Sequence, residues 1–362
     1  MPRYRARQLG LTLGDLPTGP RNALTDVAGV RVGHITLIDG EGPLVAGRGP
    51  VRTGVTVIVP HPGNVYRSKV RAAVYTLNGY GKACGFEQVR ELGVIESPIA
   101  LTNTLNVPRV ADALIDDALA HNPDIGITTS TVNVIVGETN DGYLNDLQGR
   151  HVSQAHVLAA LETASDTVAE GNVGAGTGTT CFGWKGGIGT ASRVLPIELG
   201  GFTLGALIQS NFGRAPDLVI DGVPVGRLLT PEGYVDPIER GSIMIVLATD
   251  APLSSRQLER VAKRSGAALA RVGSHYGHGS GDFAIAFSTA NRVAHEAGAV
   301  TVSQMALADE GRVIEGLFRA AVESVEEAIV NSLGMAQTLV GRDGHVRYAL
   351  PLADVLAQFG GD

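Results

Sequence analysis

The sequence predicts an α/β fold in one domain spanning residues 1–362, with strands and helices arranged in layers. Short β-branched runs alternate along the chain with segments of helical periodicity, which is typical of layered α/β proteins. No Ser-rich or Pro-rich linker and no fixed-period repeat divides the chain. Hydrophobic residues make up 44% of the chain and charged residues only 18%, so we expect a large buried core and no extensive disorder.

Four apolar runs of the sequence predict buried strands. Each run is dominated by β-branched, aromatic or other apolar residues, as strands with two covered faces are. The strands are expected at residues 55–59, 132–136, 243–247 and 283–287.

Four further segments have apolar residues three and four positions apart, which predicts amphipathic helices. The first helix should end before Pro123. The last and longest should end just before Gly334, because glycine is common directly after a helix C-terminus. The helices are expected at about residues 110–119, 156–170, 258–269 and 312–333.

The charge balance excludes several classes of partner. With 36 acidic and 29 basic residues, a formal net charge of −7 and no basic stripe, the chain is not expected to bind nucleic acid or an anionic membrane. The basic residues 3–7 are not followed by an apolar stretch, and no run approaches the ~20 apolar residues of a membrane-spanning helix. Cys84 and Cys181 are far apart in the sequence and form no Cys-x-x-Cys motif, so we expect no disulfide framework and no structural zinc site. We therefore expect a cytoplasmic protein.

The common motifs for phosphate, dinucleotide, metal and serine-hydrolase sites all fail on spacing. The glycines from Gly178 to Gly183 approach a phosphate loop, but Trp184 precedes Lys185 and no Ser or Thr follows the lysine. No Gly-x-Gly-x-x-Gly follows a predicted strand, and no His-Glu-x-x-His occurs. The segment around Ser280 lacks the first glycine of a nucleophile elbow. We therefore expect no cofactor and no metal.

A glycine and a serine stand directly before the strand predicted at 243–247. Glu239, Arg240, Gly241 and Ser242 form either an ordinary turn before a strand or a self-cleaving peptide bond. In the second case the Ser242 hydroxyl attacks the preceding carbonyl, and water hydrolyses the resulting ester. The freed α-amine, with a reference pKa of about 7.7–8.0, would then act as general base at neutral pH. Spacing alone does not choose between the two interpretations.

Seven segments of the chain, taken in order, carry the features of one known family. They are residues 25–34, 141–146, 174–179, 185–193, 209–213, 241–252 and 279–282. Together they resemble the L-aminopeptidase/D-esterase (DmpA-like) and β-peptidyl aminopeptidase family, peptidase family S58. The segment that begins at Gly241 and Ser242 is similar to the family's nucleophile segment.

This resemblance implies a four-layer α/β/β/α sandwich of the N-terminal-nucleophile type, made as a precursor that cleaves itself. The cut would fall between Gly241 and Ser242, leaving an α-chain of residues 1–241 and a β-chain of residues 242–362 that stay associated. The enzyme would release N-terminal amino acids from peptides, amides or esters through a Ser242 acyl-enzyme, with no cofactor. The resemblance also implies a homo-oligomer of αβ units, a tetramer or larger.

The resemblance assigns roles to individual residues as well. Ser242 would be the nucleophile, and Ser280 and Asp282 would orient its α-amine and stabilise the charged form. Asn211 would donate a hydrogen bond to the oxyanion. Tyr143 would face the substrate, although a packed core tyrosine is an alternative for this position.

Glu138, at the end of an apolar run, is the candidate for binding the substrate's ammonium group. An aminopeptidase needs an anion there, because a buried ammonium without a partner is costly. A solvated carboxylate at a strand end is the alternative, and the sequence supports both equally. Lys82 stands where several relatives are expected to carry an acidic residue, which leaves the preference for L-α-, D-α- or β-amino acids open.

The sequence leaves two other functions open. A self-processing acyltransferase similar to the ornithine acetyltransferase group would cleave before a threonine, whereas this chain has Ser242. A non-catalytic relative would bind a small amine and never cleave itself.

Overall fold

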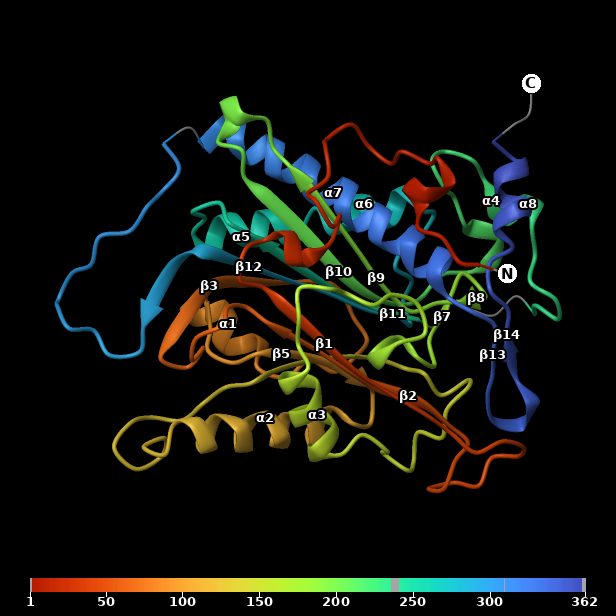
Figure 1. Cartoon of the computed structure of the whole chain (residues 1–362), viewed down its shortest axis with the longest axis horizontal. Coiled ribbons are helices and arrows are strands. Elements are labelled where there is room, and N and C mark those ends of the chain that lie inside the picture. Colours follow the sequence, from red (N-terminus) through yellow and green to blue (C-terminus); the bar gives the residue numbers. More distant parts are fainter. Residues whose placement is uncertain (1, 236–240, 309, 360–362) are drawn as a thin grey trace.

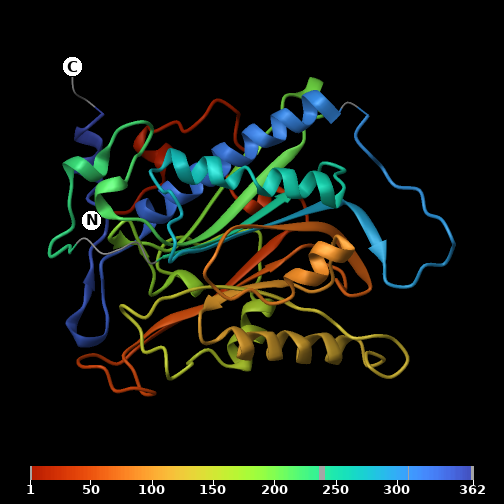
Figure 2. The same ribbon diagram turned by 180° about the vertical axis from the view of Figure 1, so that it is seen from behind.

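Two stacked β-sheets lie between two layers of helices in the computed structural model, which describes residues 2–235, 241–308 and 310–359 (Figure 1). The view from behind shows the same order of layers (Figure 2). The α/β/β/α sandwich predicted from the sequence is therefore confirmed. Within the described ranges, no helix combines the length and the apolar character needed to cross a bilayer.

The two sheets differ in size and in strand order. The smaller has four strands in the order β1 (Arg31–Asp39), β2 (Val51–Val59), β5 (Ile99–Asn103) and β6 (Ile135–Thr139). The larger has six in the order β4 (Val94–Ile95), β3 (Ser68–Gly79), β12 (Gly281–Ala294), β11 (Ser242–Thr249), β10 (Thr203–Asn211) and β9 (Ile188–Val194). The pairs β5–β6 and β11–β12 are parallel.

Helices cover the outer face of each sheet. The four-stranded sheet packs against α2 (Val107–His121) and α3 (Gln154–Glu162). The six-stranded sheet packs against α5 (Ser255–Ala262), α6 (Ser265–Arg271) and α7 (Glu310–Met335). The shorter elements are α1 (Phe86–Leu92), α4 (Val225–Leu228), α8 (Leu352–Ala357), β7 (Thr180–Cys181), β8 (Trp184–Lys185), β13 (Leu339–Val340) and β14 (Val346–Arg347).

Strand β11 is apolar throughout because both of its faces are covered. Successive side chains of a strand point to opposite faces of the sheet. Ile243, Ile245 and Leu247 therefore pack under the helices. Met244 and Val246 pack between the two sheets. The runs predicted at 55–59, 243–247 and 283–287 lie within β2, β11 and β12, so these three strands are confirmed.

The fourth strand begins later than its pattern predicts. The apolar run at 132–136 predicted a strand from residue 132, whereas β6 begins at Ile135. Before Ile135 the backbone forms a hydrogen bond with a side chain instead of with a neighbouring strand: Asn133 donates its N–H to Glu96 Oε1 at 2.9 Å. The strand begins only where β5 becomes available for pairing, at Ile99 opposite Ile135.

Three helix boundaries also differ from the prediction. The helix expected at 156–170 ends at Glu162, because Ser165 pairs with Val32 of β1 through two backbone hydrogen bonds. The single helix expected at 258–269 is two helices, α5 and α6, separated at residues 263–264. Gly334 lies inside α7 rather than after it, and its missing side chain lets the backbone of Tyr4 approach closely.

Segments from either side of position 241 are interleaved in the six-stranded sheet. Strands β11 and β12, which follow this position, lie between β3 and β10, which precede it. Helix α7 packs on β9 and β10, where Ser210 Oγ and Ser332 Oγ are 2.9 Å apart. The two segments therefore share one core, and separating them would break the middle of the sheet.

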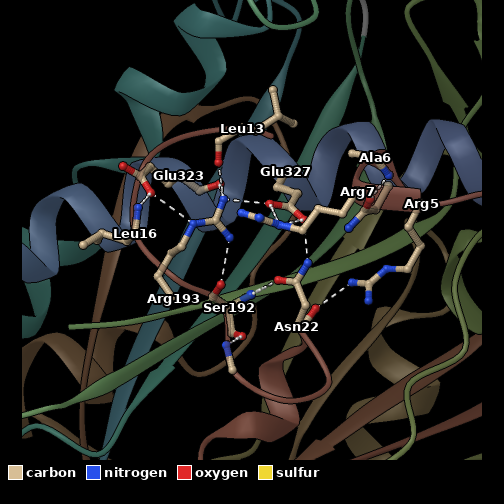
Figure 3. Close-up of polar contacts among 12 residues, drawn as sticks. Arg5, Ala6, Arg7, Leu13, Leu16, Asn22, Ser192, Arg193, Glu323 and Glu327 are labelled. Carbon is tan, nitrogen blue, oxygen red and sulfur yellow. Dashed lines mark hydrogen bonds and ion pairs between the residues drawn. The ribbon is translucent and has the colours of Figure 1, made fainter. Parts of the chain in front are cut away.

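A buried arginine joins β9 to α7 (Figure 3). Arg193 is 0% exposed, and it donates to Glu323 Oε2 at 3.0 Å and to Glu327 Oε2 at 2.7 Å. Arg7 and Asn22 also donate to Glu327, at 3.1 and 2.5 Å. This network ties the N-terminal segment and β9 to the helix that follows position 241.

Candidate active site

A cleft of about 1510 Å³ opens where β11 begins. Three residues with a predicted role in catalysis or substrate binding line it, namely Ser242, Glu138 and Tyr143. Asn211, Ser280 and Asp282 do not line the cleft; they are buried around Ser242. The other lining residues are Gly79, Tyr80, Gly81, Lys82, Thr104, Asn140, Gly142, Arg214, Gly241, His275, Gly277, His278, Gly279 and Arg342. The structure thus brings all the predicted site residues to one end of the larger sheet.

Ser242 is the first residue of β11, and its hydroxyl contacts the preceding peptide group. Ser242 Oγ donates to the Gly241 carbonyl oxygen at 2.6 Å, and Gly281 N–H donates to the same oxygen at 3.1 Å. A Cβ on Gly241 would lie 2.5 Å from the Phe212 Cα and 2.7 Å from the Asn211 carbonyl oxygen, so only glycine fits here. The remaining residues of the predicted turn, 239 and 240, lie outside the described residues.

Asn211 is the last residue of β10 and pairs directly with Ser242 across the sheet. Its Oδ1 accepts the backbone N–H of Thr180 at 2.9 Å, and its Nδ2 donates to the Asn140 carbonyl oxygen at 3.0 Å. These two contacts fix which end of the amide is the donor. The side chain is therefore held as a donor next to the nucleophile.

A fully buried lysine anchors the loop that holds Asn211. Lys185 Nζ donates to three backbone carbonyls, those of Gly176, Thr179 and Gly186, at 2.7–3.0 Å. Burial lowers the pKa of Lys185 to about 7, although the charge of Asp141 opposes this shift. Lys185 thus holds residues 176–179 in place, and the next residue, Thr180, donates its backbone N–H to Asn211.

Ser280 and Asp282 form a buried pair beside the nucleophile. Ser280 Oγ donates to Asp282 Oδ1 at 2.8 Å. Gly281 lies between them and is the register partner of Ser242 in the neighbouring parallel strand. A Cβ on Gly281 would lie 3.1 Å from Ser242 Oγ, so the glycine leaves room beside the hydroxyl.

Glu138 lies at the end of β6 and is buried, with only 3% of its surface exposed. The alternative of a solvated carboxylate is therefore wrong. Its Oε1 accepts the Lys82 backbone N–H at 2.9 Å, whereas its Oε2 has no hydrogen-bond partner among the described residues. Burial raises the pKa of Glu138, partly offset by the Lys82 N–H and charge. Oε2 of this buried carboxylate can therefore accept a hydrogen bond from a ligand in the cleft.

Glycine also allows close packing between Glu138 and the nucleophile. A Cβ on Gly81 would lie 3.3 Å from Glu138 Oε1 and 3.3 Å from the Gly281 Cα. Since Gly281 in turn borders Ser242 Oγ, two glycines line the path from the carboxylate to the hydroxyl. The two glycines pack closely, since a Cβ on Gly81 would also lie 3.0 Å from Phe283 Cε2, and this packing keeps the carboxylate near the hydroxyl.

Tyr143 is 40% exposed at the cleft, so the alternative of a packed core tyrosine is wrong. Its ring stacks on His345, with centroids 4.4 Å apart and planes 11° apart. The guanidinium of Arg347 lies 3.4 Å from the centroid of the same ring. Residues near the C-terminus therefore hold this wall of the cleft in place.

Sequence reasoning missed several residues that hold the site. Lys185 stands in the incomplete phosphate loop and begins the family segment 185–193, but neither pattern predicts its role, and Thr180 and Asn140 belong to no family segment. The sequence around Lys185, with Trp184 before it and two glycines after it, could have indicated that the lysine is buried. Its three carbonyl partners could not be predicted, because they depend on the geometry of the loop. Within the described ranges, no three His, Cys, Asp or Glu side chains are grouped as metal ligands.

Comparison with known proteins gives consistent matches over nearly the whole chain. The profile of peptidase family S58 matches residues 22–347. The beta-peptidyl aminopeptidase BapA of Sphingosinicella microcystinivorans is 42% identical over 370 residues, covering 98% of this chain and 91% of that protein. The crystal structure of the PH0078 protein of Pyrococcus horikoshii OT3 is 52% identical, with a TM-score of 0.93 and 98% of each chain covered.

A further solved structure has a described fold type. The L-aminopeptidase D-Ala-esterase/amidase of Ochrobactrum anthropi is 38% identical, with a TM-score of 0.89, covering 98% of this chain and 99% of that one. It is described as a prototype of the serine aminopeptidases and as a variant of the Ntn hydrolase fold. The fold of this chain is therefore of the Ntn hydrolase type.

Proposed function

The chain belongs to peptidase family S58 and is an aminopeptidase, and from this premise we propose that it processes itself and uses Ser242 as its N-terminal nucleophile. The observation that carries the proposal is the contact between Ser242 Oγ and the Gly241 carbonyl at 2.6 Å. The hydroxyl lies next to the peptide bond that it would attack. Ser242 at this position, where the related acyltransferases carry threonine, favours the peptidase over an acyltransferase.

Self-cleavage proceeds through an ester. Ser242 Oγ attacks the Gly241 carbonyl carbon and gives up its proton, the carbon–nitrogen bond breaks, and that proton passes to the serine nitrogen, which becomes a free amine. Gly281 N–H stabilises the developing charge on the carbonyl oxygen, as oxyanion donors do. Water then hydrolyses the ester and leaves a free α-amine on Ser242, which makes it an N-terminal nucleophile.

Peptide hydrolysis uses the same serine. Glu138 Oε2 binds the substrate ammonium, and the Ser242 α-amine takes the proton of its own hydroxyl as the acyl bond forms. Asn211 Nδ2 donates to the oxyanion, while Ser280 and Asp282 orient the α-amine and stabilise its charged form. The protonated amine then gives its proton to the departing amine, and water releases the acyl group.

The two products of the cut, residues 1–241 and 242–362, would stay together because β11 and β12 lie in the middle of the sheet. Their association needs no new contact, since the core is complete before cleavage. From the family resemblance we also propose that the αβ units form a homo-oligomer, a tetramer or larger, and from the sequence composition that the protein is cytoplasmic. The two cysteines, Cys84 and Cys181, are unpaired, as expected in a reducing compartment.

An intact-mass spectrum of the purified protein tests the proposal. Two chains of 241 and 121 residues are expected in place of one of 37.5 kDa. A single mass near 37.5 kDa after long incubation at neutral pH would overturn the self-cleavage. Acetyl transfer from N-acetylornithine to glutamate, without hydrolysis of amino-acid p-nitroanilides, would favour the acyltransferase instead.

Replacing Asn211 with alanine should lower kcat by about 10²–10³, because one oxyanion donor is lost. KM should change little, since the amide stabilises the transition state more than the bound substrate. Steady-state kinetics on amino-acid p-nitroanilides would measure both values. A matched fall in kcat and rise in KM would argue against this role.

Replacing Glu138 with glutamine should raise KM by ~30-fold or more, which corresponds to the ~2–5 kcal/mol typical of losing one partner of a buried charge pair. Burial raises the pKa of Glu138, so in the wild type the carboxylate takes up a proton at a higher pH than an ordinary glutamate. Wild-type KM should therefore rise as the pH falls through that raised pKa. In the variant, KM should be high and nearly independent of pH over this range, and a retained pH dependence would contradict the assignment.

A further inference from the structure

The charge of the cleft is opposite in sign to the charge of the whole chain. Lys82, Arg214 and Arg342 line it, whereas Glu138 is its one carboxylate among the described residues. The chain as a whole has a formal net charge of −7. A cationic cleft in an acidic protein attracts and holds an anionic group on its ligand.

Among these three cations, Arg342 has the donors to bind that group. Its Nε is buried and has no hydrogen-bond partner among the described residues, and its Nη1 reaches Asp343 Oδ2 only at 3.7 Å. Lys82 Nζ, by contrast, donates to Thr104 Oγ1 at 2.8 Å. Arg214 has interactions of its own, among them Asp217 at 3.9 Å. The planar guanidinium of arginine matches a carboxylate with two parallel hydrogen bonds.

One stretch of backbone, from residue 138 to residue 143, contributes several of the residues that line the cleft. Glu138 begins this wall, and the carbonyl oxygen of Asn140, two residues later, accepts Asn211 Nδ2 beside the nucleophile. Tyr143 ends the wall, and the backbone of Arg342 is tied just beyond it by a hydrogen bond to the Leu144 carbonyl at 3.0 Å. Along this backbone, Glu138 therefore comes first, the contact with Asn211 second, and the contact with Arg342 last.

This order matches the two ends of a short peptide. With the ammonium at Glu138 and the scissile carbonyl at Ser242, the leaving group extends toward Tyr143 and Arg342. Five residues of backbone span at most roughly 17 Å, so the path is short. A carboxylate at the far end of a dipeptide or tripeptide then falls within reach of the arginine side chain.

We propose that Arg342 binds a carboxylate on the leaving group, so that the preferred substrates are di- and tripeptides with a free C-terminus. This rests on the proposed function, because it takes Glu138 and Ser242 as the ammonium site and the nucleophile. Substrates with a neutral leaving group are cleaved by the same chemistry but bind more weakly. Arg342 is a specificity residue and takes no part in proton transfer.

The test compares a dipeptide with its own C-terminal amide. The N-terminal residue is whichever of L-Ala, D-Ala or β-Ala gives the fastest p-nitroanilide hydrolysis, and the second residue is alanine. For the wild type, kcat/KM should be ~10–100-fold higher for the acid than for the amide, as for a hydrogen bond between charged groups. In Arg342→Gln this ratio should fall toward one, through KM, while p-nitroanilide hydrolysis is retained.

Two further variants separate recognition from bulk charge and from folding. Arg48→Gln removes the same charge from an exposed residue outside the cleft and should leave the ratio unchanged. Arg342→Lys keeps the charge but loses the paired donors, so an intermediate ratio is expected. Raising the salt concentration should lower the wild-type ratio, because screening weakens the attraction.

The outcomes distinguish this inference from the proposed function. Equal rates on acid and amide in the wild type, or an unchanged ratio in both Arg342 variants, would overturn the carboxylate site and leave the aminopeptidase intact. Failure of the wild type to hydrolyse the acid, the amide and the p-nitroanilide would overturn the proposed function instead.

Discussion

Replacing Ser242 with alanine is expected to leave the chain uncut and to lower hydrolysis of amino-acid p-nitroanilides by about 10⁶, the effect of removing a catalytic serine. The variant lacks the hydroxyl that attacks the Gly241 carbonyl, so neither the ester nor the free α-amine can form. The fold should persist, because among the described residues Ser242 Oγ forms a hydrogen bond only with the preceding carbonyl. Mass spectrometry and steady-state kinetics on the same preparation would measure both effects.

Ser242→Thr is the matched control for this variant. It retains a hydroxyl on the same carbon and adds one methyl group, so slow cleavage and reduced activity are expected. Normal cleavage in Ser242→Ala would sink the proposed nucleophile. Cleavage at any bond other than Gly241–Ser242 in the wild type would do the same.

Replacing Arg193 with methionine should lower the free energy of unfolding by ~3–5 kcal/mol, the usual effect of removing one partner from a buried ion pair. Glu323 and Glu327 would lose their direct contacts with this cation, and both are almost fully buried (Figure 3). Urea unfolding would measure the loss. Using the uncut Ser242→Ala chain as background keeps the unfolding reaction unimolecular.

Arg21→Met provides the comparison for this stability effect. Arg21 also forms an ion pair, with Asp166, but their side chains are 47% and 56% exposed. Such surface pairs contribute about 0–1 kcal/mol, so the free energy of unfolding should change little. Equal losses in the two variants would show that the Arg193 network does not depend on burial.

A comparison of the predicted and observed helices shows which helix boundaries the local sequence pattern can predict. Periodicity identified α2 and α7, because an amphipathic stripe is a property of neighbouring residues. It extended α3 as far as residue 170, because the pairing of Ser165 with Val32 involves residues far apart in the chain. The late start of β6 has the same origin, since its partner strand is a distant segment.

The candidate active site likewise has features that the sequence predicted and features that only the structure shows. The family motifs identified Ser242, Asn211, Ser280 and Asp282 and grouped them in one site, and the sheet register places them side by side. The motifs did not show that Glu138 is buried with one oxygen unpartnered, because burial depends on the packing around a strand end.

By itself, the sequence determined the layered α/β class and the family to which the chain belongs, and through the family it predicted a cut between Gly241 and Ser242. These depend on residue types at short and regular spacings. Only the tertiary structure decided that Lys185 anchors the loop holding Asn211, that Arg193 joins β9 to α7, and that Arg342 and Glu138 line one cleft. A charged side chain has the same local pattern whether it is solvated or buried, and its partners come from segments that only the fold brings together.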